Sequence, residues 1–148
     1  MKAAHVISML IIAGVIVAVS KAPRGIRNNN PGNIRKSDSA WVGKMRGLDQ
    51  DFETFDSPEN GIRALVVLLK NYMKTGNDTV RKIINKYAPS NENDTSAYVA
   101  KVSEMVGVSP DFPLDERHLR SLVIAIIKHE NGRNPYTVAQ IDAGISRA

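Results

Sequence analysis

Apolar side chains recur at helical spacing from residue 57 onward. The clearest set follows Ser57-Pro58-Glu59 and ends near Thr75-Gly76, with members at positions i, i+3, i+4, i+7 and i+10: Ile62, Leu65, Val66, Leu69 and Tyr72. Side chains with this spacing lie along one face of a helix. The same patterns predict four more helices, which begin after Thr79, after Asp94 or Thr95, after Asp115 and near Val138.

The helix after Asp115 is the most apolar of the five. Its stretch Leu119–Ile127 carries apolar residues on most faces, and a helix of this kind lies in the middle of a domain. Two of the other helices end at recognisable signals. The helix after Thr79 stops before Pro89, and the next one is closed by Gly107.

A region rich in turns and aromatic residues precedes the helices. Asn28–Asn33 is a dense cluster of turn-forming residues, and Ile34–Phe55 mixes aromatic and β-branched residues with glycines. This mixture predicts short irregular strands or a hairpin. The chain therefore predicts an α+β fold that is mainly α, a single domain over residues 28–148 with a small β-hairpin region near its start.

The beginning of the chain is a continuous apolar segment. Ala3–Ser20 contains eighteen residues, of which only His5 and two serines are strongly polar. This length is close to the lower limit of about 17 residues for a membrane span. We expect residues 1–20 to form one N-terminal transmembrane helix, joined to the domain by a basic tether over residues 21–27. A cleaved signal peptide and a buried core helix are the alternatives.

The charge of the chain suits an acidic partner. Its 148 residues include 20 Lys and Arg against 15 Asp and Glu, a net charge of +5. Such a surface attracts nucleic acid, anionic lipid or bacterial wall polymer. Nucleic acid is not expected, because the basic residues are scattered and do not alternate with aromatic residues. With no cysteine and only three scattered histidines, we expect neither a metal site nor a cofactor.

One acidic residue stands in an unusual place, within Lys128-His129-Glu130-Asn131-Gly132. Glu130 falls in the last turn of the most apolar helix. The negative end of the helix dipole and apolar surroundings both disfavour a charged carboxylate there. Such a carboxylic acid stays protonated near neutral pH, as a general acid must. The alternative is a side chain exposed on a frayed last turn or paired with Arg133.

Four segments of the chain resemble a known family. They are RGIRNNNPGNIR, FxxFDSPxxGIRAL, YAPxxENDTxxYVAKV and IxxHENGRNPY, in this order. Together they resemble small phage-encoded wall-degrading proteins, often labelled phage structural proteins, which are related to the lysozyme and lytic transglycosylase superfamily. The resemblance covers nearly all of Arg24–Ala148. It implies a lysozyme-like fold that cleaves the β-1,4 bond between N-acetylmuramic acid and N-acetylglucosamine in peptidoglycan.

The order of the motifs differs from that of bacterial glucosaminidases and transglycosylases. In those enzymes the helix that ends in the catalytic Glu comes first, whereas here Glu130-Asn131-Gly132 follows Asn29–Arg35, Trp41 and Phe52-x-x-Phe55. We infer a circular permutation, which is tolerated when the termini of a domain lie close together. The chain departs from the family pattern at Asn131, where Ser is usual.

The resemblance assigns Glu130 as the catalytic acid. It also implies that Tyr98 faces Glu130 and that Thr95, in the same segment, lies at the substrate. A second carboxylate that faces the sugar leads to hydrolysis, and Asp51 and Glu53 are its first candidates, before Asp49 and Asp56. Without one, the muramoyl 6-hydroxyl attacks and leaves a 1,6-anhydro product.

Four further residues are candidate substrate-binding groups. Asn29, Asn30 and Asn33 either hydrogen-bond the N-acetyl groups of the glycan or serve only the turn in which they cluster. Trp41, the single tryptophan, either stacks on a sugar or fills the core.

Bacterial peptidoglycan is thus the expected partner, with the membrane as the second through the N-terminal helix. We expect a single-pass protein of a virion membrane or of the host inner membrane, with its catalytic domain facing the wall. Two alternatives from other classes are a non-enzymatic virion or wall-binding protein on the same fold and a peptidase. The peptidase lacks an obvious nucleophile.

Overall fold

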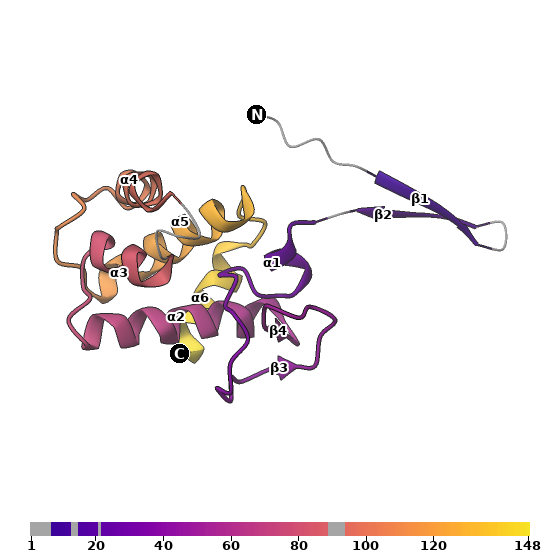
Figure 1. Ribbon diagram of the computed structural model, residues 1–148, viewed down its shortest axis with the longest axis horizontal. Coiled ribbons are helices and arrows are strands. Elements are labelled where there is room, and N and C mark those ends of the chain that lie inside the picture. Colours follow the sequence, from indigo (N-terminus) through magenta and orange to yellow (C-terminus); the bar gives the residue numbers. More distant parts are fainter. Residues whose placement is uncertain (1–6, 13–14, 21, 89–93) are drawn as a thin grey trace.

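The computed structural model describes residues 7–12, 15–20, 22–88 and 94–148 (Figure 1). The helices are α1 (Arg24–Arg27), α2 (Pro58–Lys74), α3 (Val80–Tyr87), α4 (Thr95–Val106), α5 (Leu119–Asn131) and α6 (Val138–Arg147), with the 3-10 turn η1 (Glu116–His118) before α5. The strands are β1 (Ile7–Ile12), β2 (Val15–Ser20), β3 (Lys44–Met45) and β4 (Thr54–Phe55). The five helices predicted from residue 57 onward are thereby confirmed.

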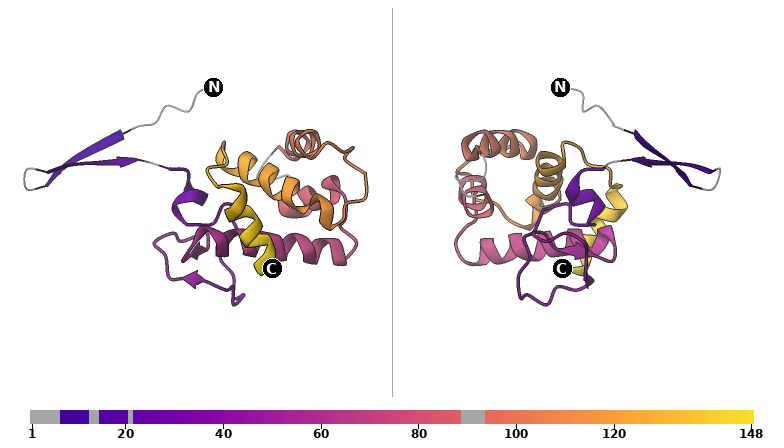
Figure 2. Two further views of the ribbon diagram at one scale, coloured as in Figure 1. Left: turned by 180° about the vertical axis from the view of Figure 1, so that it is seen from behind. Right: turned by 45° about the vertical axis from the view of Figure 1, so that its right-hand side comes forward.

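The transmembrane helix expected over residues 1–20 is wrong. Strands β1 and β2 form an antiparallel hairpin in which Ile7 lies opposite Ser20 and Ile12 opposite Val15. This hairpin projects away from the helices (Figures 1 and 2). No helix in the described part of the chain is both long and apolar enough to span a membrane. Residues 1–6, 13–14 and 21 of the expected anchor and tether lie outside the described residues.

The reason for this error is the composition of the apolar run. A short continuous apolar segment does not reveal by its periodicity whether it is helix or strand. Most residues of β1 and β2 are Ile or Val, whose branched side chains favour extended backbone.

Local capping explains why the helices begin where the sequence predicted. The side chains of Ser57 and Thr79 accept hydrogen bonds from the backbone N–H three residues later, at 3.2 Å each. Asp94 caps α4 in the same way, at 3.2 Å from the N–H of Ala97. These bonds satisfy backbone donors that have no partner within the helix.

Helix α5 is the centre of the domain. It contacts α1, α2, α4 and α6, and Figure 1 shows it between α4 and α2. Six of its apolar residues are buried: Leu119, Leu122, Val123, Ala125, Ile126 and Ile127. Because this helix is surrounded on several sides, its C-terminal turn brings Glu130 to the meeting point of the other elements.

The β region beside α2 is small, as expected. Strands β3 and β4 pair antiparallel with Lys44 opposite Phe55, and an isolated bridge joins Arg35 to Phe52. A separate apolar cluster of Ile34, Phe55 and Ala64 anchors this region to α2. The fold between residues 24 and 148 is therefore mainly helical with one short β-hairpin region.

Candidate functional site

Glu130 lies in the last turn of α5, where two side chains hold its carboxyl group. The Tyr98 hydroxyl of α4 donates a hydrogen bond to Oε1 at 2.9 Å, and the Asn33 amide donates to Oε2 at 2.9 Å. Asn33 and Glu130 are 97 positions apart in the sequence. Both carboxyl oxygens are thus oriented by donors from two different segments.

A cleft of about 440 Å³ opens at Glu130. Its described lining comes from the loop after α1, from the β region and from α2, α3 and α5. The residues are Asn33, Ile34, Arg35, Phe52, Leu68, Tyr72, Lys86, Tyr87, Ala88 and Glu130. A single carboxylate therefore stands among aromatic, apolar and basic groups, as in many sites that bind small polar ligands.

Tyr98 is fully buried and stays a neutral hydroxyl. Burial raises its pKa, and the negative charge of Glu130 raises it further. The His129 ring stacks on the Tyr98 ring with centroids 3.6 Å apart and planes 12° from parallel. The pKa of His129 is lowered by burial and by the nearby charge of Lys101, which favours the neutral imidazole. This stack holds one face of the Tyr98 ring in place.

The loop that carries Asn33 is clamped to the helices. The Asn131 amide donates to the Pro31 carbonyl at 2.7 Å and to the Ile127 carbonyl at 2.9 Å. The Tyr87 hydroxyl donates to the Gly32 carbonyl. A Cβ at Gly32 would come within 2.6 Å of that hydroxyl, so the close approach requires glycine. Asn33 has a left-handed φ of 50°, which asparagine tolerates better than most residues.

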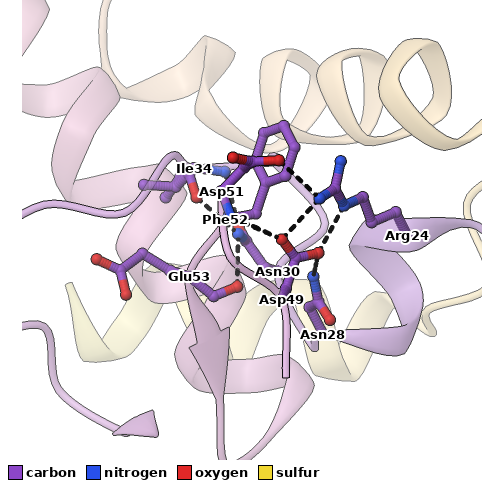
Figure 3. A network of polar contacts seen from close by, with 8 residues as sticks. All are labelled: Arg24, Asn28, Asn30, Ile34, Asp49, Asp51, Phe52 and Glu53. Carbon is purple, nitrogen blue, oxygen red and sulfur yellow. Dashed lines mark hydrogen bonds and ion pairs between the residues drawn. The ribbon is translucent and has the colours of Figure 1, made fainter. Parts of the chain in front are cut away.

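Asn29 and Asn30 serve the loop rather than the cleft. Asn30 is buried, and its amide accepts from the Ile34 N–H at 3.0 Å and donates to the carbonyls of Ile34 and Glu53 at 2.9 Å each (Figure 3). Asn29 donates to the Phe55 carbonyl at 3.1 Å. Of the three predicted asparagines, the structure brings only Asn33 to Glu130.

The two first candidates for a second carboxylate lie away from Glu130. Asp51 pairs with Arg24 at 3.1 Å and lines a different hollow, between α1 and the loop before β4. Glu53 is buried, and its Oε1 accepts from Lys44 Nζ and from the Ser37 N–H at 3.0 Å each. In Figure 3 the Glu53 side chain points away from Arg24 and Asp51. Neither carboxylate is among the described residues that line the cleft.

Asp49 forms the centre of the polar network in Figure 3. It accepts from Arg24 Nη2 at 2.8 Å and from the Asn28 amide at 2.8 Å. The hydrogen bond from Arg24 is the largest cause that holds the pKa of this carboxyl well below its usual range. Asp49 thereby connects α1 to the loop before β4, which is a structural role.

Trp41 and Thr95 also lie outside the described lining. Trp41 is half-buried and packs on the cluster of Ile34, Phe55 and Ala64, consistent with the core-filling alternative. Thr95 Oγ1 donates to the Ala88 carbonyl at 3.0 Å. Ala88 lines the cleft, so Thr95 contacts the backbone of a lining residue without being one of the described lining residues itself. Asn93, in the same motif, lies outside the described residues.

Several lining residues were missed by the sequence analysis, above all Arg35, Lys86 and Tyr72. Arg35 is the last residue of the first motif, Lys86 directly precedes the third, and Tyr72 belongs to the predicted apolar face of α2. None of these positions by itself indicates a cleft. Within the described residues, no group of three or more His, Asp or Glu could hold a metal ion.

The fold and the cleft thus define a small, mainly helical protein with one oriented carboxylate at the end of its central helix. No protein-family model matches the chain. The chain is 36% identical over 153 residues to "Protein P5" of Pseudoalteromonas phage PM2, an alignment that covers 97% of this chain and 96% of that protein. The chain therefore belongs to the family of this bacteriophage protein.

Proposed function

We propose that this phage-family protein cleaves the glycan strands of bacterial peptidoglycan with Glu130 as its general acid. One observation carries the proposal: the Glu130 carboxyl is held at a cleft by the Tyr98 hydroxyl and the Asn33 amide, one on each oxygen. The motif resemblance that singled out Glu130 and Tyr98 is independent of this geometry. Positioned groups of this kind are what general acid catalysis requires.

The two donors suit a carboxyl group that gains and loses a proton. A tyrosine hydroxyl donates to a carboxylate and accepts from a carboxylic acid, so Tyr98 serves both states of Glu130. The Asn33 amide nitrogen only donates, which leaves Oε1 as the oxygen that shares its proton with Tyr98 or with substrate. In the proposed reaction, Glu130 protonates the glycosidic oxygen and an oxocarbenium-like centre develops on the muramic acid ring.

Which nucleophile attacks that centre depends on whether a second carboxylate lies near the cleft. Asp51 is paired with Arg24 and Glu53 with Lys44, and Glu130 is the one carboxylate of the described lining. This distribution favours attack by the muramoyl 6-hydroxyl, with Glu130 now accepting that proton. The product is a 1,6-anhydro sugar, so the proposed activity is that of a lytic transglycosylase.

The path of the chain supports a circular permutation of the lysozyme-like fold. Helix α1 contacts α5, and the loop after α1 supplies Asn33 to Glu130 near the other end of the chain. Moving the segment that bears Glu130 to the front would keep these contacts and restore the motif order of the bacterial enzymes.

A second candidate function is a non-enzymatic virion or wall-binding protein. It is favoured by the relationship to a bacteriophage protein, since phage proteins need not be enzymes. In this case the cleft would hold a glycan strand, and Glu130 would act only as a hydrogen-bond acceptor.

Release of soluble fragments from dye-labelled peptidoglycan distinguishes the two. The full chain, Glu130→Gln and the control Glu116→Gln are compared in this assay. Binding is measured separately, as the fraction of each protein that sediments together with the insoluble polymer. Glu116 is exposed in η1 and is not part of the described cleft lining. Release that is lost only in Glu130→Gln supports the enzyme. Binding without release by all three supports the second function, and neither binding nor release refutes both.

A further inference from the structure

His129 and Glu130 are consecutive residues at the end of α5, and both contact Tyr98 of α4. Glu130 accepts the hydrogen bond from the Tyr98 hydroxyl at 2.9 Å, while the His129 ring stacks on the Tyr98 ring with centroids 3.6 Å apart. Successive residues of a helix point about 100° apart, so the two contacts reach Tyr98 from different directions. One tyrosine is therefore held at two points, its ring face and its hydroxyl, by neighbouring positions of one helix.

The plane of a tyrosine ring determines where its hydroxyl can donate. The hydroxyl hydrogen prefers this plane because the oxygen is conjugated with the ring, and a hydrogen bond weakens steeply when the donor is not aimed at the acceptor. The imidazole and phenol planes are only 12° from parallel, so the His129 ring constrains the plane of Tyr98. The stack therefore aims the Tyr98 hydroxyl at Oε1 of Glu130. A flexible aliphatic side chain at position 129 would not impose this constraint.

His129 lies at the edge of the core and not within it. Its side chain is half-buried and borders a surface hollow of about 590 Å³ between α4 and the end of α5. Burial and the charge of Lys101 both lower the pKa of the imidazole, which favours an uncharged ring in the stack. Filling the core does not require a planar polar ring at a half-exposed position, so the planarity of His129 is the property that Tyr98 uses.

We propose that His129 is a positioning residue of the cleavage reaction, which acts on Glu130 through the Tyr98 hydroxyl that its ring orients. The inference rests on the proposed function, because Glu130 is the general acid of that reaction. His129 is not among the described residues that line the cleft, so its effect does not require contact with the glycan.

The test is a double-mutant cycle between His129 and Tyr98, measured as kcat and KM for fragment release from peptidoglycan. His129→Leu keeps a side chain of similar size without the planar ring. Its kcat should fall about three- to tenfold, the worth of an aromatic pair, while KM stays the same. His129→Phe restores a planar ring and should recover most of this loss. In a Tyr98→Phe background, which has no hydroxyl to orient, His129→Leu should lower kcat no further.

His118→Leu is the control. The His118 ring also contacts an aromatic ring, that of Phe112, edge-on with centroids 5.9 Å apart. It belongs to η1 and is not part of the described cleft lining, so its loss should lower stability without lowering kcat.

Three results would overturn the proposal. They are a wild-type kcat in His129→Leu, an equal loss of kcat in the Leu and Phe variants, and an undiminished loss in the Tyr98→Phe background, which a merely structural histidine would cause. Failure of the proposed function looks different, because wild type would then release no fragments.

Crystal structures of the variants test the positioning of Tyr98 without any cleavage. The Tyr98 hydroxyl should stay within hydrogen-bond distance of Glu130 in His129→Phe and lie beyond about 3.5 Å from it in His129→Leu. An unchanged Tyr98–Glu130 contact in His129→Leu would contradict the proposal.

Discussion

At the scale of single residues, the proposed chemistry depends on how Glu130 is held. Tyr98 and Asn33, which both donate hydrogen bonds to it, come from different kinds of structure, a buried helix position and a loop position with left-handed backbone. Tyr98 is the more constrained of the two, because it is fully buried and stacked on His129. Removing the Tyr98 hydroxyl therefore removes a hydrogen bond to the Glu130 carboxyl group and leaves the packing of the ring nearly unchanged.

Replacing Tyr98 by Phe should lower peptidoglycan cleavage about tenfold or more, the loss expected for a hydrogen bond to a charged group. The free energy of unfolding should fall by only about 1 kcal/mol. Initial rates of fragment release and urea denaturation measure the two effects.

Tyr136→Phe is the matched control. The Tyr136 hydroxyl is buried with no hydrogen-bond partner among the described residues, so its loss should change neither quantity appreciably. Equal activity of Tyr98→Phe and wild type would refute the role of Tyr98.

At the scale of elements, the site depends on the attachment of the loop over residues 28–35 to α3 and α5. Asn131 and Tyr87 bind the carbonyls of Pro31 and Gly32, directly before Asn33. Side-chain hydrogen bonds to the loop backbone, instead of regular secondary structure, therefore fix the position of the loop.

Replacing Asn131 by Ala should destabilise the protein by about 1–3 kcal/mol, because the buried Pro31 carbonyl loses its donor. Cleavage should fall as well, since Asn33 is no longer held at Glu130. The control is Asn85→Ala, whose amide also donates to the carbonyl four residues earlier, at 2.8 Å, but on the surface. Chemical denaturation should give the control a loss under about 0.5 kcal/mol. Equal losses in the two variants would contradict the clamp.

Asp49 predicts a pH dependence of stability. Folding lowers the pKa of this carboxyl, chiefly through Arg24, so its charged form stabilises the fold at pH values above about 4, near the unfolded pKa. This contribution is lost as the pH falls from there toward the lowered value. Wild type should therefore exceed Asp49→Asn in unfolding free energy most strongly near neutral pH.

Urea denaturation at several pH values down to about 3, below the unfolded pKa of Asp, measures this difference. It should shrink as the solution is acidified, and it should be smaller at every pH in an Arg24→Gln background. A difference that is the same at all pH values would show that Asp49 does not gain its effect from its charge.

The helices were predictable because their signals are local. Ser57, Thr79 and Asp94 stand at the helix starts, and each caps its helix with its own side chain. The hairpin of β1 and β2 was not predicted, because the periodicity of a continuous apolar run does not distinguish two short strands from one helix. The roles of the three asparagines were not predictable either. Only the fold shows that Asn29 and Asn30 bond the backbone of their own region, whereas Asn33 donates to Glu130.

At the scale of the whole molecule, the site joins distant parts of the chain. Glu130 was singled out by a helix-end argument and by motif resemblance, and its partner Asn33 lies 97 positions earlier. The sequence offered acidic residues near β4 as candidate partners, but Asp51 and Glu53 form ion pairs with Arg24 and Lys44. Which charges are already paired depends on folding and could not be deduced from spacing.

The central claim is that Glu130 alone drives glycan cleavage in this protein. It is tested most directly by mass spectrometry of the soluble products from purified peptidoglycan, treated with the full chain or with Glu130→Gln. We predict 1,6-anhydro-muropeptides from wild type and none from the variant. Muropeptides with reducing ends would show that water attacks with help from a second group. An absence of soluble product from folded, wall-bound wild type, or equal product from Glu130→Gln, would contradict the account.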